Sequence, residues 1–232
     1  NIVATFNIMQ VSRLFKINHL LISSTSSVYG NSDKQPFQEI EKTDSPLSFY
    51  AATKKSCEIM AHSFSYSYRL PITLFRFFTV FGPWGRPDMA LFRFTKSILE
   101  NKQIEIYNYG NMTRDFTYID DLILGVYKLS KKIPKTTKQK IENDTLSSDA
   151  PFRIVNIGNS SPINLMDFVK ILENNLGMKA KKKFVKNQTG DVKSTWSDIS
   201  LIKSLVGYKP KSNIDEGIKK FIHWYLEYFD VR

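Results

Sequence analysis

The sequence predicts a doubly wound α/β fold, in which helices cover both faces of a parallel sheet. Helix-type and strand-type patterns alternate at the start of the chain: helix 1–16, strand 19–23, helix 50–69 and strand 71–77. Both strands are short apolar runs, which are typical of parallel strands buried on both faces. After residue 87 the pattern loosens. We therefore expect part of a doubly wound sheet, followed by a smaller C-terminal α/β part.

The later elements follow from periodicity and from helix-end signals. We expect helices at 89–101, 120–131, 164–176 and 214–229, and strands at 103–107, 113–118 and 153–158. Gly177 is suited to end the helix before it, because glycine readily adopts the left-handed C-cap conformation. We expect Asp120 and Asp121 to cap the helix that begins with them.

Composition and charge exclude several classes of protein. Of the 232 residues, 42% are hydrophobic and 24% charged, as in ordinary globular proteins. The formal net charge is +11, but the basic residues are mostly lysines gathered at 128–140 and 179–186 without interleaved aromatic residues. We interpret them as a solvated surface and expect no nucleic-acid partner. Residues 131–150 are polar and lysine-rich, and they predict a mobile surface loop.

No membrane, disulfide or metal site is expected. No apolar run is long enough to span a bilayer, and no basic leader opens the chain, so we expect a cytoplasmic protein. Cys57 is the single cysteine, which excludes an internal disulfide. His19, His62 and His223 are scattered without a Cys or carboxylate cluster, so we expect no bound metal.

Tyr50 and Lys54 are the strongest candidates for a catalytic pair. Four residues apart on a helix, their side chains lie on one face. A free phenol has a pKa of about 10, and a neighbouring ammonium lowers it toward the range of a general base. The hydroxyl-rich segment 23–27 follows a strand and offers a third group that can relay a proton. The bare Y-x-x-x-K pattern also arises by chance on surfaces, so its context must decide.

Longer strings supply that context. They are SSTSSVYG at 23–30, YAATK at 50–54, RFFTVFGP at 76–83, GPWGRPDMAL at 82–91, NYGNMTRDFTYIDD at 108–121, NIGNSSP at 156–162 and GDV at 190–192. In this order they resemble the UDP-glucuronate 4-epimerases, which are extended short-chain dehydrogenases/reductases. The resemblance covers the whole chain except the segment 131–150.

The resemblance implies a role for each matching residue. The catalytic residues are Tyr50, Lys54 and Thr25, and the cofactor-binding residues are Ser23, Tyr50, Lys54 and Phe77. The substrate-binding residues are Ser26, Ser27, Thr79, Arg86, Arg114, Gln188 and Asp191. Thr79 replaces the Asn of glucose-type epimerases, which favours a uronic-acid substrate. Arg86 is our candidate to pair with the sugar carboxylate, because a guanidinium binds carboxylates bidentately. Alternatively, Arg114 and Asp115 form a plain surface ion pair.

The implied cofactor is NAD, yet the chain lacks the usual pyrophosphate turn. None of its 10 glycines forms a G-x-G-x-x-G cluster. A Rossmann domain needs that turn between its first strand and helix. We therefore expect residues 1–85 to form the C-terminal half of an NAD-binding Rossmann domain, interleaved with later segments. Residues 86–232 are expected to form mainly a nucleotide-sugar-binding subdomain, and the chain as given is expected not to bind NAD.

The function implied is NAD-dependent 4-epimerisation of UDP-glucuronate to UDP-galacturonate through a 4-keto intermediate. UDP-glucose 4-epimerase, UDP-glucuronate decarboxylase and nucleotide-sugar dehydratase are the enzyme alternatives. A dehydratase has an Asp-Glu pair in the catalytic loop and a decarboxylase a Glu, whereas this chain has Thr25, Ser26 and Ser27. A catalytically dead remnant or assembly partner is the other alternative. The resemblance also implies a homodimer formed through helices 1–16 and 50–69.

Overall fold

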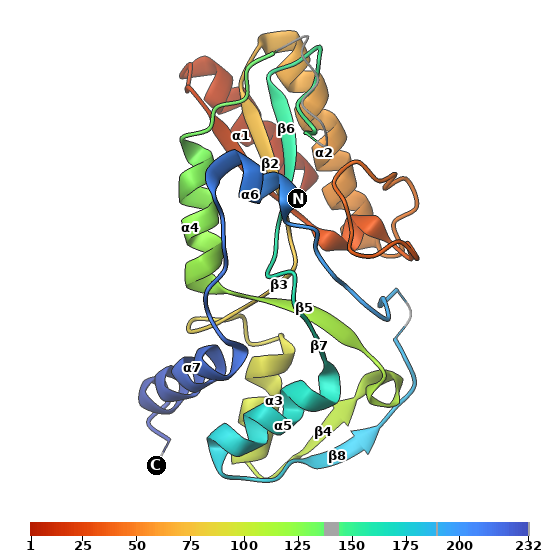
Figure 1. Ribbon diagram of the computed structural model, residues 1–232, viewed down its shortest axis with the longest axis vertical. Helices are drawn as coiled ribbons and strands as arrows, with labels where there is room; N and C mark the ends of the chain where they lie inside the picture. Colours follow the sequence, from red (N-terminus) through yellow and green to blue (C-terminus); the bar gives the residue numbers. More distant parts are fainter. Residues whose placement is uncertain (137–143, 189, 232) are drawn as a thin grey trace.

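The computed structural model describes residues 1–136, 144–188 and 190–231, in which helices and strands alternate along most of the chain (Figure 1). The α-helices are α1 (Ile2–Leu14), α2 (Phe49–Tyr68), α3 (Ala90–Leu99), α4 (Ile119–Ser130), α5 (Leu165–Leu176), α6 (Ser200–Val206) and α7 (Ile214–Tyr228). The strands are β1 (Leu20–Thr25), β2 (Ile72–Phe77), β3 (Thr79–Phe81), β4 (Gln103–Ile106), β5 (Thr113–Tyr118), β6 (Phe152–Ile157), β7 (Pro162–Asn164) and β8 (Lys181–Phe184). Two 3₁₀ helices, η1 (Ser26–Tyr29) and η2 (Tyr107–Gly110), complete the fold.

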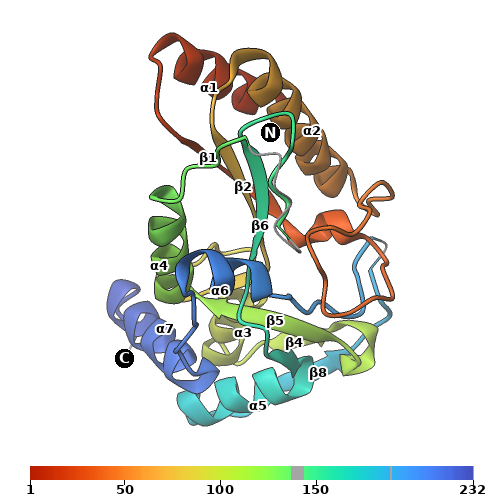
Figure 2. The ribbon, with the colours of Figure 1, turned by 45° about the horizontal axis from the view of Figure 1, so that its top comes forward.

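A parallel sheet of order β1-β2-β6 forms the upper part of the molecule (Figure 1). Alternate side chains of its strands enter two separate cores. Leu20, Ile72 and Phe152 pack with Ala61 and Phe64 of α2. The other face packs against α4 and α6 through Phe75, Val155, Ile157, Leu122, Leu129, Leu201 and Ile202. The two views show α1 and α2 together on one side of the sheet and α4 and α6 on the other (Figure 2). The doubly wound fold is thereby confirmed.

The register of this sheet places a polar row at its carboxyl end. β1 pairs with β2 from Leu20 and Ile72 onward, and β2 pairs with β6 in the same sense. On the α2 face, the first two rows across the three strands are mostly buried apolar side chains. The third row consists of Ser24, Arg76 and Asn156, which are all buried.

The lower part of the molecule is built on two small sheets, β3-β5-β7 and β4-β8. α3, α5 and α7 pack around them over an aromatic core (Figure 1). Phe116 of β5 and Phe168 of α5 stack with ring centroids 4.6 Å apart. Phe81 of β3 meets Tyr118 of β5 edge-on at 5.5 Å. Because β3 follows β2 after a single residue, this second core lies directly beyond the carboxyl end of the upper sheet.

The predicted helices and longer strands are confirmed within a few residues of their expected ends. Gly177 ends α5 in the left-handed conformation, at φ 66°. The capping expectation for Asp120 and Asp121 is wrong. The Asp121 carboxylate instead accepts the backbone N–H groups of Lys211 and Ser212, at 3.2 and 2.9 Å. It therefore ties the segment before α7 to α4.

Part of the expected mobile loop at 131–150 is fastened to β6. Residues 137–143 lie outside the described residues. Beyond them, the buried Asp144 carboxylate receives Nε and Nη2 of Arg153, at 2.9 and 3.0 Å. The Thr145 hydroxyl accepts the N–H of Ile154 at 3.0 Å. These contacts extend the order of the sheet into residues 144 and 145.

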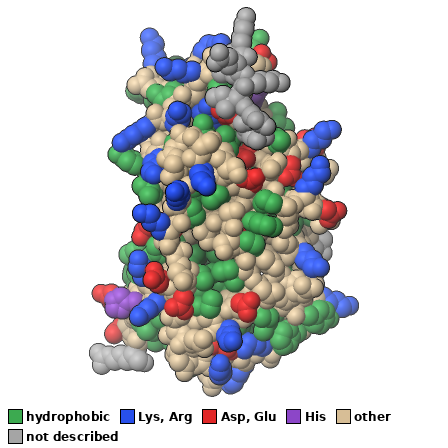
Figure 3. Space-filling view, in the orientation of Figure 1, with side chains coloured by type: hydrophobic (Ala, Val, Ile, Leu, Met, Phe, Trp, Pro, Cys, Tyr) green, Lys and Arg blue, Asp and Glu red, His purple; other side chains and the backbone are tan. Residues whose placement is uncertain are grey.

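The surface carries charges of both signs. On the face in Figure 3, Lys and Arg side chains are spread over the molecule with Asp and Glu among them. In the described ranges, no helix has the length and apolar character needed to cross a membrane. The same ranges contain no group of three or more His, Cys, Asp or Glu side chains arranged to hold a metal ion.

Gly217 allows α7 to approach the small sheet closely. A Cβ there would lie 2.6 Å from a ring carbon of Phe81 and 2.9 Å from one of Tyr118. We predict that Gly217→Ala lowers the free energy of unfolding by about 1–3 kcal/mol, because overpacking outweighs the helix propensity gained. Thermal unfolding measures the change. The exposed Lys219→Ala in the same helix is the control, and equal melting temperatures for both variants would contradict the prediction.

Candidate active site

A cavity of about 640 Å³ lies where the carboxyl ends of β1 and β2 meet the lower part of the molecule. It brings together eleven of the twelve site residues expected from the sequence. They are Ser23, Thr25, Ser26, Ser27, Tyr50, Lys54, Phe77, Thr79, Arg86, Arg114 and Asp191. Gln188 is not among the lining residues. Its side chain is exposed, and its backbone carbonyl accepts the N–H of Asp191.

The first turns of α2 place Tyr50 and Lys54 on the cavity wall. Ser48 caps the helix by accepting the N–H of Ala51 at 3.1 Å. The Lys54 ammonium donates to the backbone carbonyl of Ser23 at 2.9 Å, which joins α2 to the end of β1. Tyr50 is 48% exposed, and its hydroxyl makes no hydrogen bond to the described part of the chain. The phenol is therefore available to a bound molecule.

A tight turn holds the hydroxyl-rich loop beside this pair. Thr25 ends β1 and caps η1, since its hydroxyl oxygen accepts the N–H of Ser27 at 3.2 Å. The same hydroxyl donates to Oγ of Ser27 at 3.1 Å. Gly30 ends η1 at φ 59°, where a Cβ would lie 2.5 Å from the carbonyl oxygen of Ser45. Thr25, Ser26 and Ser27 thus all line the cavity.

Arg114 and Asp191 form an ion pair that also lines the cavity. Nη2 of Arg114 donates to Oδ1 of Asp191 at 2.7 Å, while Nη1 donates to the carbonyls of Thr113 and Lys193. Burial lowers the pKa of Arg114 and the charge of Asp191 opposes this change. The alternative of a surface pair between Arg114 and Asp115 is wrong. Asp115 is fully buried and accepts backbone N–H groups from three residues: Ser197, Asn159 and Ser160.

The 82–89 loop forms the rim of the cavity. Arg86 is 72% exposed and pairs with Asp88 at 3.2 Å, so its guanidinium lies at the edge of the site. Trp84 has a left-handed backbone, at φ 62°, and its ring packs 5.3 Å from Trp224 and 5.1 Å from Tyr228 of α7. The rim is therefore braced by the C-terminal helix.

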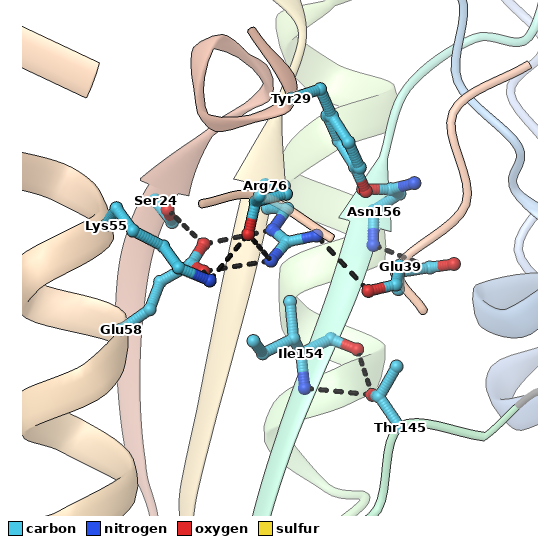
Figure 4. A network of polar contacts seen from close by, with 10 residues as sticks. Ser24, Tyr29, Glu39, Lys55, Glu58, Arg76, Thr145, Ile154 and Asn156 are labelled. Carbon is cyan, nitrogen blue, oxygen red and sulfur yellow. Dashed lines mark hydrogen bonds and ion pairs between the residues drawn. The ribbon is translucent and has the colours of Figure 1, made fainter. Parts of the chain in front are cut away.

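The polar row of the upper sheet contains functional candidates that the sequence reading missed (Figure 4). Nε and Nη2 of Arg76 donate to the two oxygens of Glu58, at 3.0 and 2.9 Å, and the Ser24 hydroxyl donates to the same carboxylate at 2.7 Å. Burial raises the pKa of the Glu58 carboxyl, but hydrogen bonding to Arg76 and its charge lower it overall. Two signals were available: Arg76 is the single charge in an apolar strand, and Glu58 lies one helical turn beyond Lys54.

Glu39 is a second carboxyl beside this row. It lies in the 31–48 loop and is buried, which raises its pKa to about 7. The N–H of Asn156 donates to its Oε1 at 2.8 Å, which opposes that rise. Tyr29 donates to the Asn156 side chain at 2.7 Å and stacks on Phe37 with centroids 4.6 Å apart. The loop is thus fixed to β6 by one carboxyl, one amide and two rings.

Comparisons with known proteins identify the family of the chain. The model of the NAD dependent epimerase/dehydratase family matches residues 1–143. Protein CapI of Staphylococcus aureus is 48% identical over 99% of this chain and 69% of its own length. The chain belongs to the NAD dependent epimerase/dehydratase family. A probable UDP-glucuronate 4-epimerase of Rhizobium meliloti is 44% identical to this family member over 97% of the chain and 67% of the relative.

Solved structures extend the likeness to the fold. The UDP-glucuronic acid 4-epimerase of Bacillus cereus, in complex with UDP-glucuronic acid and NAD, superposes with a TM-score of 0.84 at 32% identity. The alignment covers 98% of this chain and 67% of that one. MoeE5 in complex with UDP-glucuronic acid and NAD has the same TM-score at 27% identity, over 98% of this chain and 71% of its own. The expected family is thus confirmed, and NAD is supported as its cofactor.

The raised pKa of Glu39 predicts a pH dependence of stability. Its folded-state value of about 7 exceeds the usual value of 4.5, so the folded chain binds the proton more tightly. The stabilisation that protonated Glu39 contributes is complete below pH 4.5 and is lost as the pH rises through 7. The free energy of unfolding then falls by about 3 kcal/mol. We predict that the melting temperature of Glu39→Gln falls less between about pH 5 and 8 than that of the wild type. Asp33→Asn, exposed in the same loop, is the control; an unchanged decrease in Glu39→Gln would refute the prediction.

Proposed function

We propose that this chain carries the catalytic and nucleotide-sugar-binding residues of a UDP-glucuronate 4-epimerase, which converts UDP-glucuronate to UDP-galacturonate through a 4-keto intermediate. The observation that carries the proposal is the cavity itself. Tyr50, Lys54 and Thr25 line it together with the Arg114–Asp191 pair. The likeness to named UDP-glucuronate 4-epimerases supports the choice of substrate.

Tyr50 is the proposed base that removes the proton of the sugar 4-hydroxyl. Lys54 lies one helical turn away and stabilises the resulting phenolate by its charge. The Thr25 hydroxyl bridges phenol and sugar as a proton relay. NAD, when bound, accepts a hydride from C4 and returns it to the opposite face, so the reaction consumes no oxidant.

The residues on the cofactor side fit the nicotinamide end of NAD. The Lys54 ammonium donates one of its three N–H groups to the Ser23 carbonyl, which leaves two donors for ribose hydroxyls. Phe77 is half-buried at the end of β2 and offers an apolar surface to the nicotinamide ring. We propose that these residues, together with Ser23 and Tyr50, hold this end of the cofactor.

The remaining lining residues suit a uronic-acid nucleotide. Arg114, released from Asp191 or shared with it, can bind phosphate oxygens, and Asp191 can accept from uridine hydroxyls. The 4-keto intermediate is a β-keto acid that loses carbon dioxide readily, so its carboxylate must be held. Thr79 and the hydroxyls of Ser26 and Ser27 lie within the cavity for this task, and Arg86 approaches from the rim.

Product analysis tests the proposed reaction. The complete gene product is incubated with NAD and UDP-glucuronate, and the sugar nucleotide formed is identified by NMR. UDP-galacturonate is the expected product, with the C4 hydrogen retained when the reaction runs in deuterium oxide. A UDP-pentose would identify a decarboxylase, and unchanged substrate would identify a catalytically dead protein. Either result overturns the proposal.

The proton-transfer step gives a sharper prediction. Tyr50→Phe removes the base but leaves the ring in place, so kcat is expected to fall by about 10²- to 10⁴-fold. Tyr66→Phe is the matched control, because Tyr66 is 57% exposed on the same helix and does not line the cavity. Full activity in Tyr50→Phe would exclude the phenol as the base.

We further propose that two copies of the protein associate through α1 and α2. The two helices pack against each other and leave large apolar side chains in solvent. Ile8 is 55% exposed and Ile59 is 61% exposed. Exposed apolar side chains gathered on two neighbouring helices are typical of a protein–protein contact.

The association is measured by sedimentation. The Ile8→Glu and Ile59→Glu double variant is expected to be monomeric at concentrations where the wild type is a dimer, because two buried charges per copy oppose the contact. Ile123→Glu, at a 54% exposed site on α4, is the control. A wild-type monomer, or a dimer that survives the double substitution, would contradict this mode of assembly.

A further inference from the structure

The Glu58–Arg76 ion pair joins the catalytic helix to the middle strand of the sheet. Glu58 follows Lys54 by one turn of α2, and Arg76 precedes Phe77 in β2. Both side chains are only 2% exposed. The contact is a two-point fork, in which Nε and Nη2 donate to different carboxylate oxygens at 3.0 and 2.9 Å. Such a fork fixes both the distance and the orientation of its partners.

The same carboxylate also reaches the strand that presents the catalytic hydroxyls. Ser24 precedes Thr25 in β1, lies opposite Arg76 in the parallel register, and donates to Glu58 at 2.7 Å. Figure 4 shows the three side chains converging from α2, β1 and β2. One buried carboxylate therefore joins α2 to both strands.

Few buried side chains lie in this half of the helix, which the Lys54 bond to the Ser23 carbonyl also joins to β1. From its start to residue 60, the buried residues of α2 are Ala51, Cys57 and Glu58. Two of them are small, whereas the large buried ring Phe64 lies beyond. Apolar packing alone leaves a helix freer to slide or rotate than a hydrogen-bonded fork does.

Arg76 also contacts the loop that leads into α2. Thr43 accepts from Nη2 of Arg76 at 3.4 Å and from the Lys55 ammonium, and Nη1 of Arg76 donates to the Glu39 carbonyl at 3.3 Å. The Arg76 guanidinium lies 4.8 Å from the ring centroid of Tyr29. The loop before α2 and the end of the hydroxyl-rich loop thus both contact the Arg76 guanidinium.

We propose that the Glu58–Arg76 fork is a positioning device that holds Tyr50 and Lys54 in register with Thr25. It touches neither substrate nor cofactor, since neither residue lines the cavity. A buried ion pair adds little stability over an apolar pair of similar volume. The geometry it imposes, and not stability, is therefore its contribution. The kinetic part of this proposal rests on the proposed epimerase function.

The test compares two buried forks in one protein. Glu58→Leu with Arg76→Met removes the first fork. Asp144→Leu with Arg153→Met removes an equally buried fork at the opposite end of the sheet, and serves as the control. Arg76→Lys keeps the countercharge but loses the two-point geometry. The complete gene product is used for every variant.

Three measurements are made on each variant: steady-state kinetics with UDP-glucuronate, thermal unfolding, and amide hydrogen exchange of residues 49–54 without ligands. For the Glu58/Arg76 double variant we expect kcat to fall about 10- to 100-fold with KM changed less than about threefold. We expect its exchange at 49–54 to accelerate. Arg76→Lys should show the same direction in both measurements, because its charge alone does not hold the helix. The control should change neither kcat nor exchange at 49–54.

A wild-type kcat in the Glu58/Arg76 double variant would overturn the positioning role. So would wild-type kcat and exchange in Arg76→Lys. The same holds for unchanged exchange at 49–54. If a variant unfolds, Arg76→Lys and the control pair still decide between geometry and countercharge. If the wild type converts no UDP-sugar, the proposed function fails, while the exchange measurement still tests the positioning because it requires neither NAD nor substrate.

Discussion

The hydrogen bond between the Lys54 ammonium and the Ser23 carbonyl joins the two elements on which the site depends. One is a helix that crosses the face of the sheet, and the other is a strand that ends at its carboxyl edge. Because β1 and β2 run parallel, their polar termini meet at one edge. The hydroxyls after β1 and the segment after β2 therefore face the same cavity. Binding at this edge is the general consequence of a doubly wound sheet.

Burial on both faces explains where polar groups enter the fold. Along the α2 face, two largely apolar rows cross the sheet before the row of Ser24, Arg76 and Asn156. On this face, apolar rows thus supply stability away from the site, and the buried polar row of the three strands lies where the catalytic helix must be aligned. The arrangement separates the part of the sheet that holds the chain together from the part that orders the cavity.

The longer elements were predictable because each has a repeated pattern. β1 opens with an apolar run, β2 is mostly apolar, and α5 ends at a glycine. The short strands β3, β7 and β8 have three or four residues each, too few to establish a period. Long-range partners were equally hidden. Arg114 precedes Asp115 in sequence but pairs with Asp191, 77 residues away, while Asp115 is buried under backbone amides.

The resemblance placed eleven residues in one cavity because motif strings retain the local geometry of their loops. It missed the Glu58–Arg76 fork, since the single charge of β2 indicates that a buried partner exists but does not identify that partner. It also assigned Gln188 a substrate contact, although the backbone turn at Asp191 leaves that side chain exposed and off the cavity lining. Loop residues are the least constrained by pattern and the most dependent on tertiary contacts.

The charge balance of the polar row follows from its single cation. Arg76 is buried and keeps its proton, with its pKa raised despite burial by the bond to Glu58. One buried cation can neutralise one carboxylate, and Glu58 takes that role with a lowered pKa. Arg76 donates a hydrogen bond to the backbone carbonyl of Glu39, and its charge lowers the pKa of the Glu39 carboxyl less than burial raises it, so that carboxyl holds a proton to about pH 7. The two carboxyls therefore differ in charge although they lie beside the same guanidinium, and only the ionised one has the symmetric pair of acceptors that a fork requires.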